Sequence, residues 1–165
     1  MEAARPATRD DLDRLVELAE QAADELSAGR GGKLWRRREA RPPPVRGSLE
    51  ASVAASEAGD DQLVVVGTID EVTVGFAAVH RETLRDGDHL GVIDDLYVEP
   101  GARQIGVGES MMQRVLDWCE AQGCIGVDSL ALPGERHTKN FFESFGLVAR
   151  AIVVHRALDQ GTDET

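Results

Sequence analysis

The stretch LYVEPGARQIGVG, residues 96–108, decides the fold: an apolar segment ends at Pro-Gly, and a loop with two glycines follows. Residues 107–122 then repeat apolar side chains on one helical face and stop at Gly123, which predicts a helix. The first N–H groups of a helix lack internal partners and carry partial positive charge, so an anion is stabilised there. We therefore expect the loop at 103–108 to bind phosphate; a glycine-rich turn without a ligand is the alternative.

Two other phosphate-binding motifs do not fit this loop. A dinucleotide-binding fingerprint has a third small residue three positions after its second glycine, where this chain has Met111. A nucleotide P-loop needs Gly-Lys followed by Ser or Thr, and the sequence has no such triplet. The loop is therefore neither a dinucleotide fingerprint nor a P-loop.

The segments on either side of the loop predict a mixed sheet. Three β-branched, apolar segments separated by turn residues predict an antiparallel meander, at residues 63–69, 72–83 and 89–98. The elements expected after the helix are a strand at 124–132, a helix at 135–145, a strand at 148–158 and a polar tail at 159–165. The crossover through one helix favours parallel pairing of the strands on either side of it.

The N-terminal part adds helices to this sheet. The elements expected there are a strand at 3–8, a helix at 10–27 capped by Thr8 or Asp10, a loop at 28–47 and a weak helix at 48–58. The predicted fold class is therefore mixed α/β (α+β), with a mostly antiparallel central sheet, one parallel strand pair and flanking helices. We expect a single domain over residues 1–165.

Composition and charge exclude several classes of protein. The chain has 165 residues, of which 42% are hydrophobic and 29% charged, as in soluble globular domains. No apolar run approaches the roughly 20 residues of a membrane span, and no signal-peptide core is present, so we expect a cytoplasmic protein with no membrane partner. A net charge of −12 argues against nucleic acid as a partner. Residues 30–46 differ, because seven Lys and Arg against one Glu give 7 − 1 = +6.

Cysteine and histidine spacing predicts no metal site. Cys119 and Cys124 fit no common ligand motif, and we expect both to be reduced packing residues. His80, His89 and His155 lie in or beside predicted strands without metal-ligand spacing, and we expect structural roles for them.

The motifs around the loop together resemble the GNAT superfamily of acetyl-CoA-dependent N-acetyltransferases. The resemblance rests on residues 96–100 (LYVEP), on the loop RQIGVG and on residues 141–147 (FFESFGL). The family signature is L-x-V-x-P, then R/Q-x-x-G-x-G/A, a helix, a strand and a helix ending Y-E-x-x-G-F. The match is strong over residues 88–158, and over 3–85 it is limited to the order of the elements.

The resemblance implies acetyl-CoA as co-substrate. In the family, amides of the strand before the loop hold the acetyl carbonyl and pantetheine, and the loop amides hold the pyrophosphate. The strand before the loop and the next strand splay apart, and the pantetheine arm inserts between them. The matching cofactor-binding residues here are Leu96, Tyr97 and Val98 on the strand, Arg103, Gln104, Ile105, Gly106, Val107 and Gly108 in the loop, and Asn140 and Phe142 on the later helix.

The sequence matches the family's cofactor-binding residues more fully than its acid–base residues. Asp94 and Asp95 are the expected bases; as strand neighbours they should point to opposite faces, and we favour Asp95. The family usually has a tyrosine at the position of Phe142 to protonate the leaving sulfur, and phenylalanine cannot donate. Tyr97 is the first substitute donor and His137 the second. Trp35, within the basic segment, is expected to contact the acceptor, as is Asp95.

The sequence thus predicts an N-acetyltransferase that transfers acetyl to a primary amine of a small molecule by direct attack. The alternatives are a protein lysine or N-terminal acetyltransferase and a non-catalytic acyl-CoA-binding module, which the missing tyrosine keeps open. Many members of the family dimerise, so the resemblance allows a homodimer.

Overall fold

The structure is a computed structural model that describes residues 1–158; the predicted polar tail lies outside them. The chain forms two compact units, Met1–Ala22 with Arg41–Ser129, and Ala23–Ala40 with the chain from Leu130 onward. The helices are α1 (Leu12–Ser27), α2 (Gly32–Arg38), α3 (Val45–Ala58), α4 (Val107–Ala121) and α5 (Arg136–Ser144). The sheet, α3 and α4 belong to the first unit, and α2 and α5 to the second.

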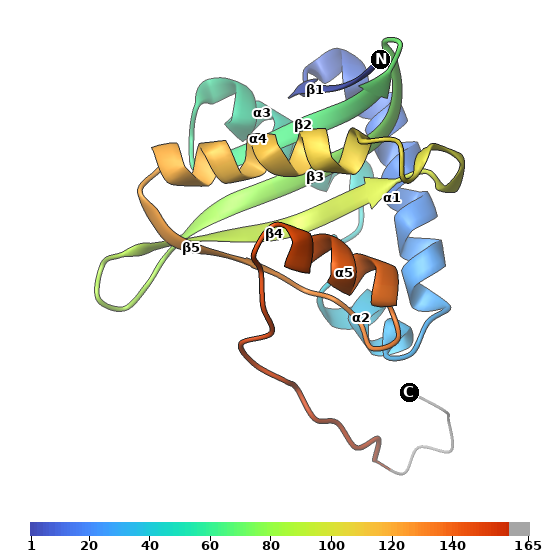
Figure 1. Cartoon of the computed structure of the whole chain (residues 1–165), viewed down its shortest axis with the longest axis vertical. Helices are drawn as coiled ribbons and strands as arrows, with labels where there is room; N and C mark the ends of the chain where they lie inside the picture. The colour runs from blue at the N-terminus through green and yellow to red at the C-terminus, as the bar shows by residue number, and fades with distance from the viewer. Residues whose placement is uncertain (159–165) are drawn as a thin grey trace. The chain divides into compact units, whose positions relative to one another are not determined.

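One five-stranded sheet organises the first unit, as Figure 1 shows. Its strands are β1 (Glu2–Pro6), β2 (Gln62–Ile69), β3 (Val72–Thr83), β4 (His89–Val98) and β5 (Cys124–Ser129), and they follow in this order across the sheet. The pairs from β1 to β4 are antiparallel, whereas β5 lies parallel to β4. The predicted meander, the crossover through α4 and the mixed fold class are confirmed.

Helices cover both faces of this sheet, with α4 on one face and α3 on the other (Figure 1). Leu49 and Val53 of α3 join the buried cluster that contains Val64, Phe76 and Ala78. On the opposite face α4 packs so close to β2 that a Cβ on Gly67 would lie 2.5 Å from the Cγ1 of Val107. This close approach fixes the start of α4 against the sheet.

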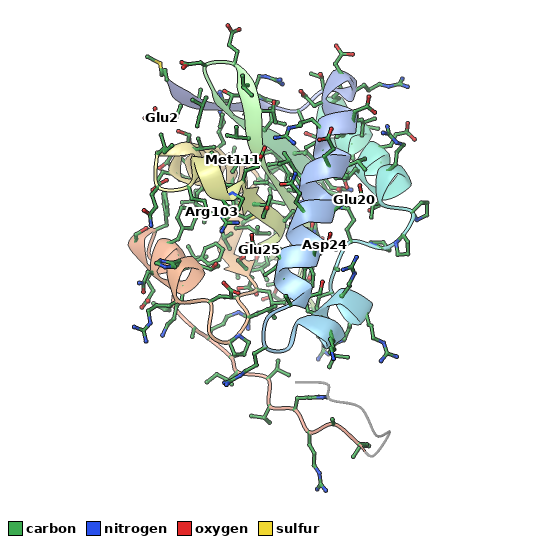
Figure 2. The ribbon with its side chains drawn as sticks, turned by 90° about the vertical axis from the view of Figure 1, so that its right-hand side faces the viewer. Glu2, Glu20, Asp24, Glu25, Arg103 and Met111 are labelled. Atoms are coloured by element: carbon green, nitrogen blue, oxygen red, sulfur yellow. The ribbon has the colours of Figure 1, made fainter. Side chains whose placement is uncertain are left out.

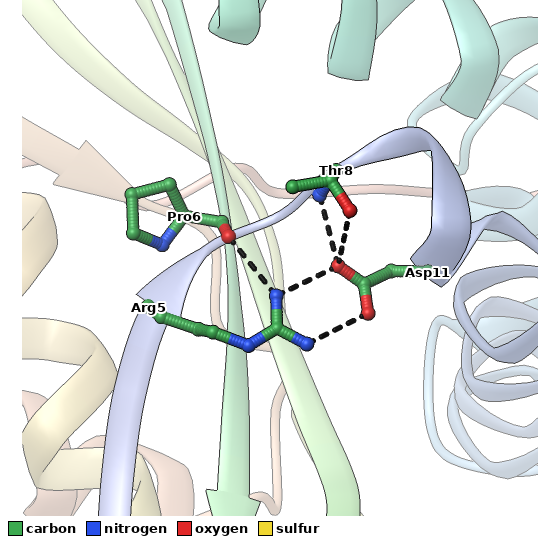
Figure 3. Close-up of polar contacts among 4 residues, drawn as sticks. All are labelled: Arg5, Pro6, Thr8 and Asp11. Atoms are coloured by element: carbon green, nitrogen blue, oxygen red, sulfur yellow. Dashed lines mark hydrogen bonds and ion pairs between the residues drawn. The ribbon is translucent and has the colours of Figure 1, made fainter.

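The turn between β1 and α1 is held by a carboxylate, as Figure 3 shows. Asp11 accepts hydrogen bonds from both terminal nitrogens of Arg5, each at 2.9 Å, and from the backbone N–H of Thr8 at 2.8 Å. Thr8 is the N-cap of the short 3-10 helix Arg9–Asp11, which precedes α1. Leu15 and Leu18 of α1 join the buried cluster that also contains Leu49 and Val53 of α3.

A β-bulge on β4 corrects the prediction that Asp94 and Asp95 point to opposite faces. Ile93 pairs with Val79 and Asp95 with Ala78, so Asp94 is an extra residue in β4. The shift places Asp95 opposite Ala78, on the face of β3 that also carries His80, since side chains alternate along a strand. Asp94 contacts that same His80. Both carboxylates therefore lie on one face of the sheet, the face covered by α3.

Two further predictions differ from the structure. The expected loop at 28–47 contains α2, because the run from Lys33 to Arg38 consists mostly of good helix formers and the glycines and prolines lie outside it. The expected strand at 148–158 is wrong: these residues form neither helix nor strand, and Val148, Ile152, Val153 and Val154 are 79–89% exposed. β-Branched residues favour a strand only where a neighbouring strand supplies hydrogen bonds and packing.

Candidate active site

The outer edge of β4 is open next to the loop. Pairing between β4 and β5 ends at Ile93 and Ser129, whereas β4 runs on to Val98. Within residues 1–158, no strand pairs with β4 on that side from Asp94 to Val98. Backbone N–H and C=O groups of an edge strand are available to an extended ligand. The edge includes Leu96, Tyr97 and Val98, the residues predicted to hold an acetyl group and pantetheine.

This open edge leads to the N-terminus of α4. After β4 come a 3-10 turn, Pro100–Ala102, and the loop, which ends at Gly106, the N-cap of α4. Gly106 has φ +102° and Gln104 has φ +65°, so the loop turns sharply and leaves its amides at the start of the helix. Figure 2 labels Arg103 and Met111 at this end of α4, with Glu2 above them. The geometry is that of an anion-binding helix end.

Arg103 links the loop back to β4. Its Nε donates to the carbonyl of Val98 at 2.8 Å, and its guanidinium carbon lies 5.5 Å from the ring centre of Tyr97. Tyr97 is 8% exposed, belongs to the core cluster, and donates from its hydroxyl to Gln21 on α1 at 3.5 Å. Arg103 therefore places a cation beside the strand residues that are predicted to hold the thioester. A role of Tyr97 as proton donor stays a prediction.

Asp95 forms a buried ion pair with Arg41. The side chains are 17% and 10% exposed, and the other terminal nitrogen of Arg41 donates to the hydroxyls of Ser48 and Ser52 on α3, each at 3.0 Å. Burial raises the pKa of the Asp95 carboxyl, and the charge and hydrogen bond of Arg41 oppose that rise. Asp95 is thus engaged by a cation from the chain itself, which sequence reasoning did not anticipate.

Asp94 pairs with His80 on the same face. The Oδ2 of Asp94 lies 2.7 Å from the Nδ1 of His80, and the side chains are 39% and 36% exposed. The bulge therefore gathers two carboxylates, a guanidinium and an imidazole where β4 parts from β5. Amine chemistry next to a thioester needs charged groups of this kind.

A family model, acetyltransferase (GNAT) family, matches residues 32–147. The chain belongs to the GNAT family of acetyltransferases. No curated protein sequence matches the chain.

Solved structures with the GNAT fold resemble the whole chain. Glucosamine-6-phosphate N-acetyltransferase from Arabidopsis thaliana has a TM-score of 0.69 at 19% identity, covering 96% of this chain and 99% of that one. A tetramutant of the BH1408 protein from Bacillus halodurans has a TM-score of 0.73 at 20% identity, covering 94% and 99%. AAC(6′)-Iy, in complex with the bisubstrate analogue CoA-S-monomethyl-acetylneamine, has a TM-score of 0.69 at 17% identity, covering 95% and 97%. At these identities the likeness shows the GNAT fold.

The basic segment of this GNAT chain is largely neutralised by its own acids. Arg36 pairs with Asp24 at 3.1 Å, Arg38 with Glu39 at 3.3 Å and Arg46 with Asp13 at 2.6 Å, besides the pair that Arg41 forms. At least four of the seven cations in residues 30–46 are thus in ion pairs with carboxylates. The cations of this segment therefore pair largely with carboxylates of the chain itself.

The remaining predicted site residues lie in the second unit of the GNAT chain. Trp35 is half-buried on α2. On α5, Asn140 is exposed and Phe142 is 7% exposed, with its ring 5.7 Å from that of Phe141. The hydroxyl-free Phe142 therefore occupies a buried place on α5. Contacts of Trp35, Asn140 and Phe142 with a ligand stay predictions.

The described residues offer little for other chemistries. Within residues 1–158, no group of three or more His, Cys, Asp or Glu side chains is arranged to hold a metal ion. Cys119 is buried and Cys124 half-buried, both thiols are free, and burial raises the pKa of Cys119 to about 12, with a further contribution from Cys124. None of the helices in the described range is long and apolar enough to cross a membrane.

Proposed function

We propose that this GNAT acetyltransferase transfers the acetyl group of acetyl-CoA to the primary amine of a small molecule. The observation that carries the proposal is the open edge of β4 from Asp94 to Val98, which leads directly to the glycine-capped N-terminus of α4. An extended pantetheine arm fits an edge strand, and a pyrophosphate fits a helix N-terminus.

The chain's own residues fit acetyl-CoA at both ends of this path. The backbone of Leu96, Tyr97 and Val98 holds the thioester carbonyl and the pantetheine arm. The backbone amides from Arg103 to Gly108 hold the pyrophosphate, and Gly106 suits that role because a Cβ there would already lie 3.1 Å from the Cγ of Glu2. A larger side chain at residue 106 would have no room beside the phosphates.

The acceptor is a compact cationic amine. The bulge puts Asp94 and Asp95 side by side on one face of the sheet, next to Leu96, where the proposed binding site for the thioester begins. A net charge of −12 raises the local concentration of cationic acceptors. Asp95 can take a proton from the ammonium only when Arg41 releases it, so a role as base requires the arginine to move.

Two measurements test the proposal together. Calorimetry gives the affinity for acetyl-CoA, and a thiol-release assay reports turnover with polyamines, aminoglycosides, amino acids and lysine peptides. We expect binding together with thiol release for at least one small amine. Binding without thiol release from any amine would identify a non-catalytic acyl-CoA-binding protein, and release with peptides alone would identify a protein acetyltransferase.

A further inference from the structure

We infer that His80, oriented by Asp94, is the group that removes the proton from the acceptor's ammonium. The inference rests on the proposed function and assigns a residue that the sequence motifs do not contain. An ammonium has no free electron pair, so a base must deprotonate it before its nitrogen attacks the thioester. The base must lie near the thioester, be accessible to a solute, and be able to accept a proton.

The position of the dyad meets the first requirement. Asp94 is the first β4 residue beyond the last β4–β5 pair, Ile93 with Ser129. Leu96, the first of the three strand residues proposed to hold the thioester and pantetheine, lies two residues further, about 6–7 Å along the strand. His80 is on the neighbouring strand, with Val92 as its Cα partner. The imidazole therefore lies beside the start of the open edge.

Accessibility separates the two carboxylates. The side chains of His80 and Asp94 are 36% and 39% exposed, whereas Asp95 and Arg41 are 17% and 10% exposed. Asp95 is also held by a guanidinium that bonds two serines of α3, so three hydrogen bonds keep Arg41 in place. An amine from solution meets the imidazole of His80 without first breaking a buried ion pair.

The hydrogen bond fixes which nitrogen of His80 can accept a proton. An ionised carboxylate only accepts, so the Nδ1 at 2.7 Å from Asp94 must carry the hydrogen. The Nε2 of the neutral ring then presents its lone pair, and within residues 1–158 the structure shows no hydrogen bond to it. When Nε2 takes a proton, the charged ring lies against the Asp94 carboxylate, which stabilises it.

Among the described strands, the charged groups on this face near the ring are Glu82, two residues along β3, Asp94 and Asp95 on β4, Asp128 on β5, and Arg41 ahead of α3. Asp128 is the Cα partner of Val92, and Gln62, the β2 partner of His80, is neutral. Asp95 and Arg41 compensate each other. The carboxylates of Asp94 and Glu82 add negative charge beside the ring, which favours the approach of an ammonium.

The reaction balances as follows. One proton of the ammonium passes to Nε2 of His80, and the nitrogen lone pair forms the C–N bond to the acetyl carbon while the C–S bond breaks and its electron pair leaves on sulfur. The second proton lost by the nitrogen, or the one held on Nε2, neutralises the thiolate, and the other goes to solvent. The products are the acetamide, free coenzyme A and one released proton.

The test compares three single variants of the full chain, using an amine that the thiol-release screen identifies. His80→Asn keeps a donor for Asp94 but removes the base, and we expect kcat/KM at pH 7 to fall about 100-fold, within the usual range for a general base. The acidic limb of the kcat/KM–pH profile should disappear, and acetyl-CoA affinity should stay within twofold. Asp94→Asn should lower kcat/KM without removing that limb. The matched control is His89→Asn, a half-exposed strand histidine that contacts Thr83 at 3.4 Å, and it should leave activity unchanged.

Two further variants and imidazole rescue distinguish a base from a structural residue. Free imidazole should restore turnover to His80→Ala but not to Asp95→Asn, because only the former leaves a cavity that lacks a base. The inference is overturned if His80→Asn retains kcat/KM within threefold, or if Asp95→Asn, rather than His80→Asn, removes the acidic limb. If the wild-type chain binds acetyl-CoA but acetylates no amine, the proposed function fails and this inference fails with it.

Discussion

The guanidinium of Arg41 and the carboxylate of Asp95, 54 residues apart in the chain, form a buried ion pair that ties the segment ahead of α3 to the middle of β4. Ser48 and Ser52 hold the second terminal nitrogen of the arginine, so the pair also fixes α3 on the sheet. The pair lies next to the open edge of β4, so it contributes both to the stability of the first unit and to the geometry of the proposed acceptor site.

Removing one member of this pair should destabilise the protein strongly. Asp95→Asn leaves the Arg41 charge buried without a counter-ion, and we expect the free energy of unfolding to fall by about 3 kcal/mol. In the double variant Arg41→Met/Asp95→Asn, the free energy of unfolding should fall by clearly less than the sum of the losses in the two single variants, since no charge is left buried. Urea unfolding measures all three. Additive losses would contradict a direct pair.

The same site gives an expectation for turnover. Asp95→Ala should lower turnover, because the released Arg41 charge repels the acceptor's ammonium, with little change in acetyl-CoA affinity. The loop at 103–108, where we propose that the pyrophosphate binds, lies beyond the end of β4, and this change does not alter it. A loss of acetyl-CoA affinity as large as the loss of turnover would indicate that the sheet itself had been disturbed.

Asp11 should make stability depend on pH in the acid range. Hydrogen bonds from Arg5 and Thr8 lower the pKa of its carboxyl, and burial only partly opposes them (Figure 3). The unfolded chain therefore binds this proton more readily, and stability rises with pH across the window. The contribution is present above the ordinary carboxyl pKa of about 3.9 and is lost as pH falls through the lowered pKa of Asp11.

The matched variant for this effect is Asp11→Asn. It keeps the size of the side chain but has no carboxyl to titrate, and we expect it to be less stable at pH 7 by about 1.5–3 kcal/mol, the range for hydrogen bonds to a charged group. The difference in unfolding free energy between wild type and variant should shrink as pH falls below about 4. A difference that stays constant down to acid unfolding would show that the ion pair does not contribute through ionisation.

Local sequence patterns predicted most of the fold. The features that they did not predict depend on contacts between residues that are distant in the sequence. The meander and the crossover follow from β-branched segments and turn residues that lie next to one another in the sequence. The bulge at Asp94 forms only when β4 pairs with β3, so alternation along β4 alone gave the wrong face for one carboxylate. The apolar segment 148–158 has strand-like composition, but composition does not supply a neighbouring strand.

In the candidate site too, local motifs were predicted from the sequence and contacts between distant residues were not. The loop and the strand before it are contiguous, and their motif placed them at the end of β4 and the start of α4. Arg41 contacts Asp95, which lies 54 residues later in the chain, and no spacing rule reveals that contact. His80 had a usable signal: counting back from the Thr83–His89 pair places it opposite Val92, diagonal to Asp94 on the same face. Treating the histidines only as metal ligands hid that relation.

The loop should lose acetyl-CoA when it gains negative charge. Gly106→Glu should abolish binding, because the new carboxylate would occupy the place of the phosphates and residue 106 has a positive φ that strains any other side chain. Ile105→Asp separates charge from strain, since Ile105 is 47% exposed and its φ is not positive. We expect at least a tenfold weaker affinity by calorimetry for Ile105→Asp and less than a threefold change for the control Ile105→Asn. Equal affinities for the two variants would contradict the proposal that the pyrophosphate binds at this loop.

Glu2 should oppose the binding of the same pyrophosphate. Its Oε1 lies 3.3 Å from the point that a Cβ on Gly106 would occupy, so a carboxylate stands at the anion-binding end of α4. Glu2→Gln should tighten acetyl-CoA binding about two- to fivefold at low salt, the range of charge effects at a helix end, and the gain should shrink in 0.5 M salt. The same substitution should slightly lower stability, because the helix end loses a favourable negative charge.

The opposite signs of these two effects make the measurement decisive. A change that merely loosened the N-terminus would weaken both stability and binding, whereas removal of a competing charge weakens one and strengthens the other. Glu120→Gln is the control, since Glu120 is exposed near the other end of α4, roughly 20 Å away. Glu120→Gln should leave acetyl-CoA affinity unchanged. If Glu2→Gln also leaves it unchanged, the phosphates do not lie at Gly106, because a carboxylate so close to them would repel them and weaken binding.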